Sequence, residues 1–230
     1  MFGAILLDMD GTLVDSEEIT IAAIEEILGQ RGIVFTREHK DFTARHAWDK
    51  VLDLLYTAHP DLPPVRTFLD QVLSRKAVMM KSGQVPLLPG AREIFTRLSA
   101  TMKLAVVSGS FSHEIAFLLS HMGVEDHCHF SLGGDQMTRH KPHPESYLTA
   151  ARVLGVAPEQ CLVVEDSPFG IEAGLKSGAA VVAISAGNRY GFDQSAAHFI
   201  LPTLNDLTLP TLADLYRQWQ AMRPAPGRTP

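Results

Sequence analysis

Short apolar runs alternate with amphipathic stretches along most of the chain, a pattern that predicts strands alternating with helices. Runs of the strand type lie at residues 2–7, 103–108, 129–133, 161–165 and 180–184. Helical spacing of apolar positions predicts helices near residues 90–100, 111–122, 144–155 and 168–177. Because such alternation is typical of a parallel sheet covered by helices, we predict an α/β core with a Rossmann-like sheet.

Residues 16–83 break this alternation, because only helical patterns occur there. Asp15 and Ser16 precede an amphipathic stretch that ends near Gly32, and two further helical periods flank a proline-containing break at residues 60–64. We interpret residues 16–83 as an all-helical domain inserted into the core. The predicted core then comprises residues 1–15 and 84–215, and the proline-rich composition of residues 222–230 predicts a disordered tail.

Charge and composition indicate which partners and which cellular compartment to expect. The formal net charge of the 230 residues is −6 and no run of Lys or Arg occurs, so we expect no nucleic-acid partner. No apolar window has membrane-spanning length, so we expect no membrane partner. Cys128 and Cys161 lie in or beside strand-like segments and are interpreted as two buried, reduced thiols. We expect a monomer in the cytoplasm.

Two carboxylates follow the first apolar run, at Asp8 and Asp10. Strand alternation places both side chains on one side of the chain, and Gly11 permits a tight turn directly after them. Since like charges so close repel, a divalent cation such as Mg²⁺ is needed to keep both ionised. Asp8 is then a candidate nucleophile and Asp10 a candidate proton donor. These residues alone leave open a solvated acidic turn.

Polar residues also follow later strand-like runs, and the carboxyl ends of parallel strands meet in one crevice. The run at residues 104–107 leads into Ser108, Gly109 and Ser110, which can donate hydrogen bonds to phosphate oxygens. Lys141 lies in a basic loop and supplies a compact positive charge for a phosphoryl group.

The run at residues 162–164 leads into Glu165 and Asp166, whose carboxylates are hard oxygen ligands for Mg²⁺. Together with Asp8, they complete a candidate metal site. Any one of these features is also consistent with a helix cap or a surface ion pair. Their joint occurrence in this order points to phosphoryl transfer.

With these motifs in this order, the chain resembles the haloacid dehalogenase-like superfamily, within it the phosphatases and phosphomutases that carry a helical cap. The resemblance covers about residues 1–212 and rests on Asp8, Asp10 and Thr12, on Ser108 and Lys141, and on the segment from Glu165 to Gly174. It implies a sheet whose strands, numbered along the chain, have the order 3-2-1-4-5. It also implies that residues 16–83 form the cap.

The resemblance further implies an aspartyl-phosphate on Asp8 and Mg²⁺ held by Asp8, the main-chain carbonyl of Asp10, Asp166 and, in support, Glu165. Phosphate is expected to be bound by Thr12, Ser108, Gly109, Ser110 and Lys141. The second Asp of the motif argues against dehalogenase activity, because a dehalogenase has no leaving group to protonate. We therefore expect a Mg²⁺-dependent phosphatase acting on a small sugar or polyol phosphate.

Two alternatives stay open. One is a phosphomutase resembling β-phosphoglucomutase, although that family has a cap His ten residues after the acid/base Asp and this chain has Thr20 there. The other is a non-catalytic ligand-binding module. Substrate contacts are expected from Glu18 and Thr20, and from Arg45 and His46 in a predicted loop at residues 41–46 between helical stretches.

Overall fold

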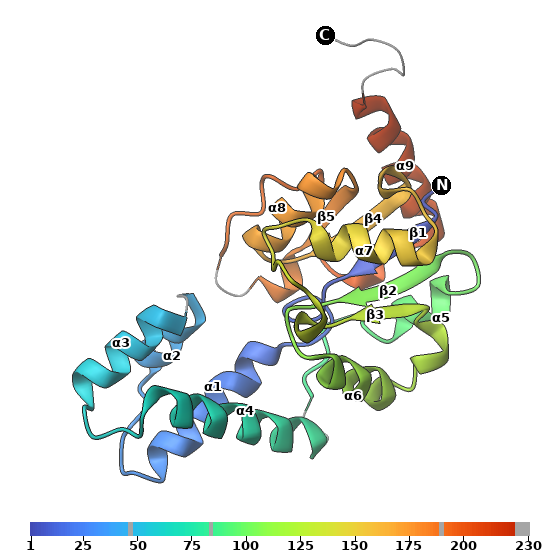
Figure 1. The fold of residues 1–230 in the computed structure, drawn as a ribbon. Helices are drawn as coiled ribbons and strands as arrows, with labels where there is room; N and C mark the ends of the chain where they lie inside the picture. The colour runs from blue at the N-terminus through green and yellow to red at the C-terminus, as the bar shows by residue number, and fades with distance from the viewer. Residues whose placement is uncertain (46–47, 83–84, 189–190, 224–230) are drawn as a thin grey trace. The chain divides into compact units, whose positions relative to one another are not determined.

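The computed structural model describes residues 1–45, 48–82, 85–188 and 191–223 of the chain. They form two compact units, one drawn from residues 1–14 and 87–223 and the other from residues 15–86. The predicted tail at residues 222–230 lies outside the described residues from position 224 onward, and Met222 is the last residue of a helix. Figure 1 shows the course of the chain.

The first unit contains a six-stranded sheet in which each neighbouring pair of strands is parallel. Its strand order is β3-β2-β1-β4-β5-β6, which confirms the predicted order 3-2-1-4-5 and adds one edge strand. β1 and β4 pair in the centre, with Leu7 opposite Val164, so both strands end at the same level. The strands are β1 (Ala4–Leu7), β2 (Lys103–Val107), β3 (Phe130–Leu132), β4 (Cys161–Glu165), β5 (Ala180–Ile184) and β6 (Phe199–Leu201).

Five α-helices belong to this unit within the described residues: α5 (Glu93–Leu98), α6 (Ser112–Met122), α7 (Glu145–Leu154), α8 (Pro168–Ser177) and α9 (Leu209–Met222). The first four confirm the predicted helices, whereas α9 and β6 were not predicted. α7 and α8 cover one face of the sheet (Figure 1), where Leu6 and Val163 pack against Tyr147 and Ile171. Alternation places Ile5 and Leu7 on the opposite face, and both are fully buried. The central strands are therefore apolar on both faces, as buried parallel strands are.

The second unit is helical in its described residues, with α1 (Ser16–Gly29), α2 (Arg37–Arg45), α3 (Trp48–Ala58) and α4 (Val65–Lys81). The predicted helix after Asp15 is confirmed as α1. The Asp15 carboxylate caps the start of this helix by accepting a hydrogen bond from the Glu18 amide. Ile24, Leu55 and Phe68 lie at the centre of the unit's own apolar core. The unit thus has a core separate from that of the sheet.

The loop predicted at residues 41–46 is wrong for residues 41–45, which form the second half of α2; His46 lies outside the described residues. The segment Arg37–Arg45 is strongly polar, so its few apolar positions gave no clear helical period. Two tertiary contacts stabilise the helix. Lys40 forms an ion pair with Glu25 at 2.7 Å, and Phe42 packs against the helical core.

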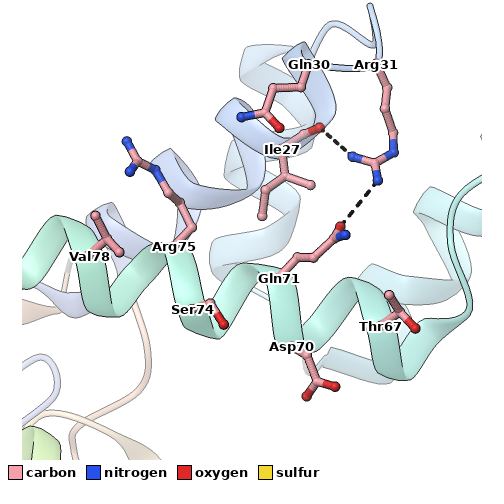
Figure 2. Close-up of a pocket in the computed structure, with 9 residues that line it drawn as sticks. All are labelled: Ile27, Gln30, Arg31, Thr67, Asp70, Gln71, Ser74, Arg75 and Val78. Carbon is pink, nitrogen blue, oxygen red and sulfur yellow. Dashed lines mark hydrogen bonds between the residues drawn. The ribbon is translucent and has the colours of Figure 1, made fainter.

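A groove of about 500 Å³ lies between α1 and α4 (Figure 2). Arg31 spans it, donating one hydrogen bond to the Ile27 carbonyl at 3.1 Å and another to the Gln71 side chain at 3.3 Å. Arg75 pairs with Glu26 at 2.6 Å. The polar side chains of the groove therefore join the two helices.

Both cysteines are free thiols, as predicted, although only Cys161 is fully buried and Cys128 is half-buried. Burial, with a smaller contribution from Glu159, raises the pKa of the Cys161 thiol to about 12. In the described part of the chain, no helix has both the length and the apolarity needed to cross a bilayer.

Candidate active site

The site lies where the central strands end. The Asp8 amide donates to the Val164 carbonyl at 2.9 Å, which continues the β1–β4 pairing one residue past β1. This bond brings Asp8 beside Glu165 and Asp166 at the end of β4. One carboxylate oxygen from each of these three residues lies within 4.8 Å of the others, and all three residues are buried. A cluster of hard oxygen atoms at this spacing is suited to a divalent cation.

A tight turn after Asp8 allows the acidic cluster to form. Gly11 has φ of 76°, and its amide donates to the Val14 carbonyl at 2.8 Å. That backbone conformation favours glycine, and space requires it too, because a Cβ at this position would fall on the carboxylate of Asp166. Gly11 therefore lets the backbone after β1 approach the carboxylate after β4.

Lys141 joins the acidic residues. Its ammonium donates to Asp8 at 2.5 Å, to Glu165 at 2.7 Å and to the Val107 carbonyl at 3.1 Å. Burial by itself would lower the pKa of Lys141, but the charges of Asp8 and Glu165 outweigh it and hold this pKa well above its usual value. Lys141 is therefore a fixed positive charge beside Asp8.

Glu165 is fully buried and accepts hydrogen bonds at both carboxylate oxygens. Its Oε1 accepts from Lys141 at 2.7 Å and from the Tyr147 hydroxyl at 2.6 Å. Its Oε2 accepts from the Asp166 amide at 3.1 Å, and from the amide and hydroxyl of Ser167 at 3.3 and 3.1 Å. Because its oxygens are occupied by the protein, Glu165 is well suited to hold its neighbours in place.

Asp10 has different surroundings from Asp8. Its Oδ2 accepts hydrogen bonds from the Ser108 hydroxyl at 2.9 Å and from the Ser110 hydroxyl at 2.6 Å. Asp10 is also not a member of the cluster formed by the carboxylates of Asp8, Glu165 and Asp166. The two carboxylates of one short motif thus have different neighbours: Asp8 lies in the acidic cluster, and Asp10 lies against two hydroxyl groups.

Besides Lys141, the predicted phosphate-binding residues number four and occupy two places. Ser108 and Ser110, with Gly109 between them, form the turn after β2, where the Ser110 amide donates to the Ser108 hydroxyl at 2.9 Å. Thr12 is fully buried, and its hydroxyl donates to Asp166 at 3.4 Å. Thr12 therefore contacts the acidic cluster, while the phosphate-binding role of all four residues stays a prediction.

Two residues of the site were not predicted from the sequence. Tyr147 of α7 reaches Glu165 from a fully buried position. Gln194 is also buried, and its amide group donates to the carbonyl of Asp166 at 2.8 Å and to that of Ile184 at 3.2 Å. Gln194 thereby ties the residue after β4 to the end of β5. Neither side chain stands in a motif, so only the tertiary fold could reveal these contacts.

The predicted substrate-contact residues belong to the helical unit. Glu18 is exposed on α1, and the Thr20 hydroxyl donates to the Ser16 carbonyl at 2.9 Å. Arg45 is the last residue of α2, and His46 falls outside the described residues. Substrate contact by these four residues stays a prediction.

The charge balance of the site favours a bound cation. The site contains four carboxylates, those of Asp8, Asp10, Glu165 and Asp166, and the ammonium of Lys141 contacts two of them, Asp8 and Glu165. Burial raises the pKa of Asp8 well above its usual range; Lys141 opposes this rise, whereas Glu165 and Asp10 add to it. A divalent cation beside Asp8 would favour its ionised form. The donor set and its charge therefore fit a divalent cation.

Comparison with known families agrees with this geometry. The family profile of haloacid dehalogenase-like hydrolases matches residues 5–184. The chain belongs to this family. The resemblance predicted from the motifs is therefore confirmed, as is the α/β fold with its parallel sheet.

Named relatives within the family include phosphatases. Hexitol phosphatase B of Escherichia coli (strain K12) is 30% identical over 172 residues, which cover 74% of this chain and 78% of that protein. Fructose-1-phosphate phosphatase YqaB of the same strain is 27% identical over 179 residues, covering 77% of this chain and 93% of that protein.

A solved structure gives a similar result. A HAD family hydrolase from Deinococcus radiodurans R1, crystallised with bound phosphate and sodium, is 30% identical to this chain. The two structures match with a TM-score of 0.72 over 93% of this chain and 96% of that one. The similarity thus includes the helical unit as well as most of the sheet unit.

Proposed function

We propose that this chain is a Mg²⁺-dependent phosphatase that hydrolyses a small sugar or polyol phosphate through an aspartyl-phosphate on Asp8. Family membership and the names of relatives, a hexitol phosphatase and a fructose-1-phosphate phosphatase, support the reaction and the substrate class. The observation that carries the proposal is the different surroundings of Asp8 and Asp10. A double displacement needs one carboxylate as nucleophile and another as proton carrier.

Asp8 is the proposed nucleophile. It lies at the end of β1 in contact with Lys141, which favours its ionised form. Attack of its carboxylate oxygen on phosphorus forms the aspartyl-phosphate and releases the substrate oxygen as an alcohol. Lys141 lies close enough to Asp8 to neutralise charge that develops on the transferring phosphoryl group.

Asp10 is the proposed general acid and base. It protonates the leaving oxygen in the first step, and it then removes a proton from the water that attacks the aspartyl-phosphate. The hydroxyls of Ser108 and Ser110 hold one of its oxygens. This contact fixes the carboxyl group outside the acidic cluster, so it can exchange a proton with substrate and water.

Asp8 and Asp166 would hold Mg²⁺ through their carboxylates, together with the main-chain carbonyl of Asp10. When bound, the cation would neutralise the transferring phosphoryl group and keep Asp8 ionised. Glu165, whose two oxygens accept five hydrogen bonds from the protein, supports this set by holding Lys141 and the Asp166 amide. Thr12 and Gln194 hold the carboxylate and the carbonyl of Asp166.

We assign residues 15–86 the role of the cap. In this proposal, substrate selection depends on the helical unit and chemistry on the sheet unit. Glu18, Thr20, Arg45 and His46 are the proposed contacts to the organic part of the substrate.

The test is phosphate release from a panel of sugar and polyol phosphates, each with Mg²⁺ and with a chelator. The proposal predicts Mg²⁺-dependent release that Asp8→Asn abolishes without loss of folded protein. A coupled assay that detects conversion of β-glucose 1-phosphate to glucose 6-phosphate distinguishes a phosphomutase. Isomerisation without net release would contradict a phosphatase, and failure to turn over any phosphate ester, including an aryl phosphate, would favour a binding module.

A further inference from the structure

Tyr147 is a buried titratable residue to which the proposed reaction gives no step. It lies on α7 with no exposed surface, and its ring packs in the apolar core between α7 and the sheet. A buried tyrosine hydroxyl needs a hydrogen-bond partner. Its partner here is the Oε1 atom of Glu165, at 2.6 Å.

The same oxygen also accepts the hydrogen bond from Lys141, at 2.7 Å. The ammonium of Lys141 in addition lies 4.9 Å from the centre of the Tyr147 ring, within the range of a cation–π interaction. Tyr147 therefore contacts Lys141 twice, directly through its ring and indirectly through Glu165.

Lys141 is held between two carboxylates, because it donates to Asp8 at 2.5 Å and to Glu165 at 2.7 Å. These two hydrogen bonds, together with the third to the Val107 carbonyl at 3.1 Å, set the position of the ammonium. A second donor on Glu165 Oε1 shares the negative charge of that oxygen and weakens its attraction for Lys141. The ammonium is then available to Asp8 and to a phosphoryl group beside it.

We propose that Tyr147 is a positioning residue that holds Glu165 and Lys141 so that the ammonium of Lys141 faces Asp8. This inference rests on the proposed phosphatase function for its effect on rate, but its geometry is independent of the reaction. Tyr147 does not contact the substrate in this proposal. Its effect should therefore appear in kcat, with little change in KM.

Tyr147→Phe is the direct test, because it removes the hydroxyl and keeps the ring that fills the core. Tyr56→Phe is the matched control: the Tyr56 hydroxyl donates to the Pro63 carbonyl within the helical unit, so this variant also loses one tyrosine hydrogen bond. We expect Tyr147→Phe to lower kcat about tenfold or more and to change KM by no more than about twofold, since hydrogen bonds to charged groups are among the stronger ones. Tyr56→Phe should leave both constants unchanged.

A second measurement does not depend on activity. Acetic anhydride at limiting concentration labels lysine amines, and mass spectrometry gives the labelling rate of Lys141 relative to that of exposed Lys176 in the same sample. We expect this ratio to change by about threefold or more in Tyr147→Phe. The variant loses the hydrogen bond from Tyr147 to Glu165, and the contact of Glu165 with the Lys141 ammonium changes as a result. Tyr56→Phe should reproduce the wild-type ratio.

The outcomes separate the two proposals. Wild-type protein that hydrolyses no phosphate ester would overturn the phosphatase proposal, and the labelling ratio would still decide the role of Tyr147. A Tyr147→Phe variant with the wild-type labelling ratio would overturn the positioning role. The positioning role would also be overturned if the wild type is active and Tyr147→Phe keeps the same kcat. The same holds if Tyr147→Phe loses thermal stability but shows no change in kcat or in the labelling ratio.

Discussion

Gly11→Ala tests whether the turn after β1 sets the position of Asp166. An ideal Cβ on Gly11 would lie no more than 2.9 Å from each of the three carboxyl atoms of Asp166. Ordinary van der Waals contact begins at 3.4 Å, so the nearest of these atoms would have to move by more than 1 Å. We expect the Asp166 carboxylate to move rather than the backbone, because the atoms that the Cβ would meet belong to a side chain.

The substitution should lower both the free energy of unfolding and the rate of the reaction, for two separate reasons. Alanine at a φ of 76° is strained by about 1–2 kcal/mol, which lowers the free energy of unfolding. Displacing a group of the active site by about 1 Å costs on the order of 100-fold in rate, because positioning is lost. We therefore expect kcat to fall about 100-fold and the Mg²⁺ concentration for half-maximal activity to rise.

Gly178→Ala is the matched control. Gly178 follows the last residue of α8 as its C-cap, with φ of 81°, and a Cβ there would meet no atom within 4 Å. The two variants share the backbone strain, so thermal unfolding should shift by similar amounts, whereas only Gly11→Ala should lose activity. Equal kcat and equal Mg²⁺ titration curves in the two variants would refute the proposed role of Asp166 as a positioned ligand.

Two further substitutions test the remaining roles in the reaction. Asp10→Asn should slow the first turnover of an alkyl phosphate by about 100-fold or more, and that of 4-nitrophenyl phosphate much less, because nitrophenolate leaves without a proton. Equal losses in rapid-quench measurements of the two esters would argue against Asp10 as the general acid. Asp166→Ala should raise the Mg²⁺ requirement on the order of 100-fold, since it removes a hard oxygen ligand. A Mg²⁺ titration identical to that of the wild type would exclude Asp166 from the metal site.

The sheet and the motif residues could be predicted because their signals are local. Apolar runs such as residues 104–107 lie in strands of the structure, and the polar residues that follow them lie at the carboxyl ends of those strands. Asp8 and Lys141 are 133 positions apart, yet the predicted topology already brings their segments to one edge. Strand order and the meeting of these motifs therefore followed from pattern and family resemblance.

The prediction failed where local signals were weak. The segment Arg37–Arg45 is too polar to show its helix, which is stabilised by contacts with α1 and with the apolar core of the helical unit. The edge strand β6 is only three residues long, and its neighbour α9 lies beyond the last predicted strand. Tyr147 and Gln194 reach the site through tertiary packing alone, so spacing along the chain contains no sign of either contact.

The central claim is a covalent phosphate on Asp8, and trapping it is the most direct test. Sodium borohydride reduces an acyl phosphate to the alcohol, which converts an aspartyl-phosphate to homoserine. We predict that protein quenched during turnover of a phosphate ester with Mg²⁺ carries homoserine at position 8, detectable by mass spectrometry of the peptide that contains Asp8 and Asp10. Protein without substrate should keep Asp8 unchanged. Reduction at Asp10, or no reduction in an enzyme that is turning over, would contradict the account.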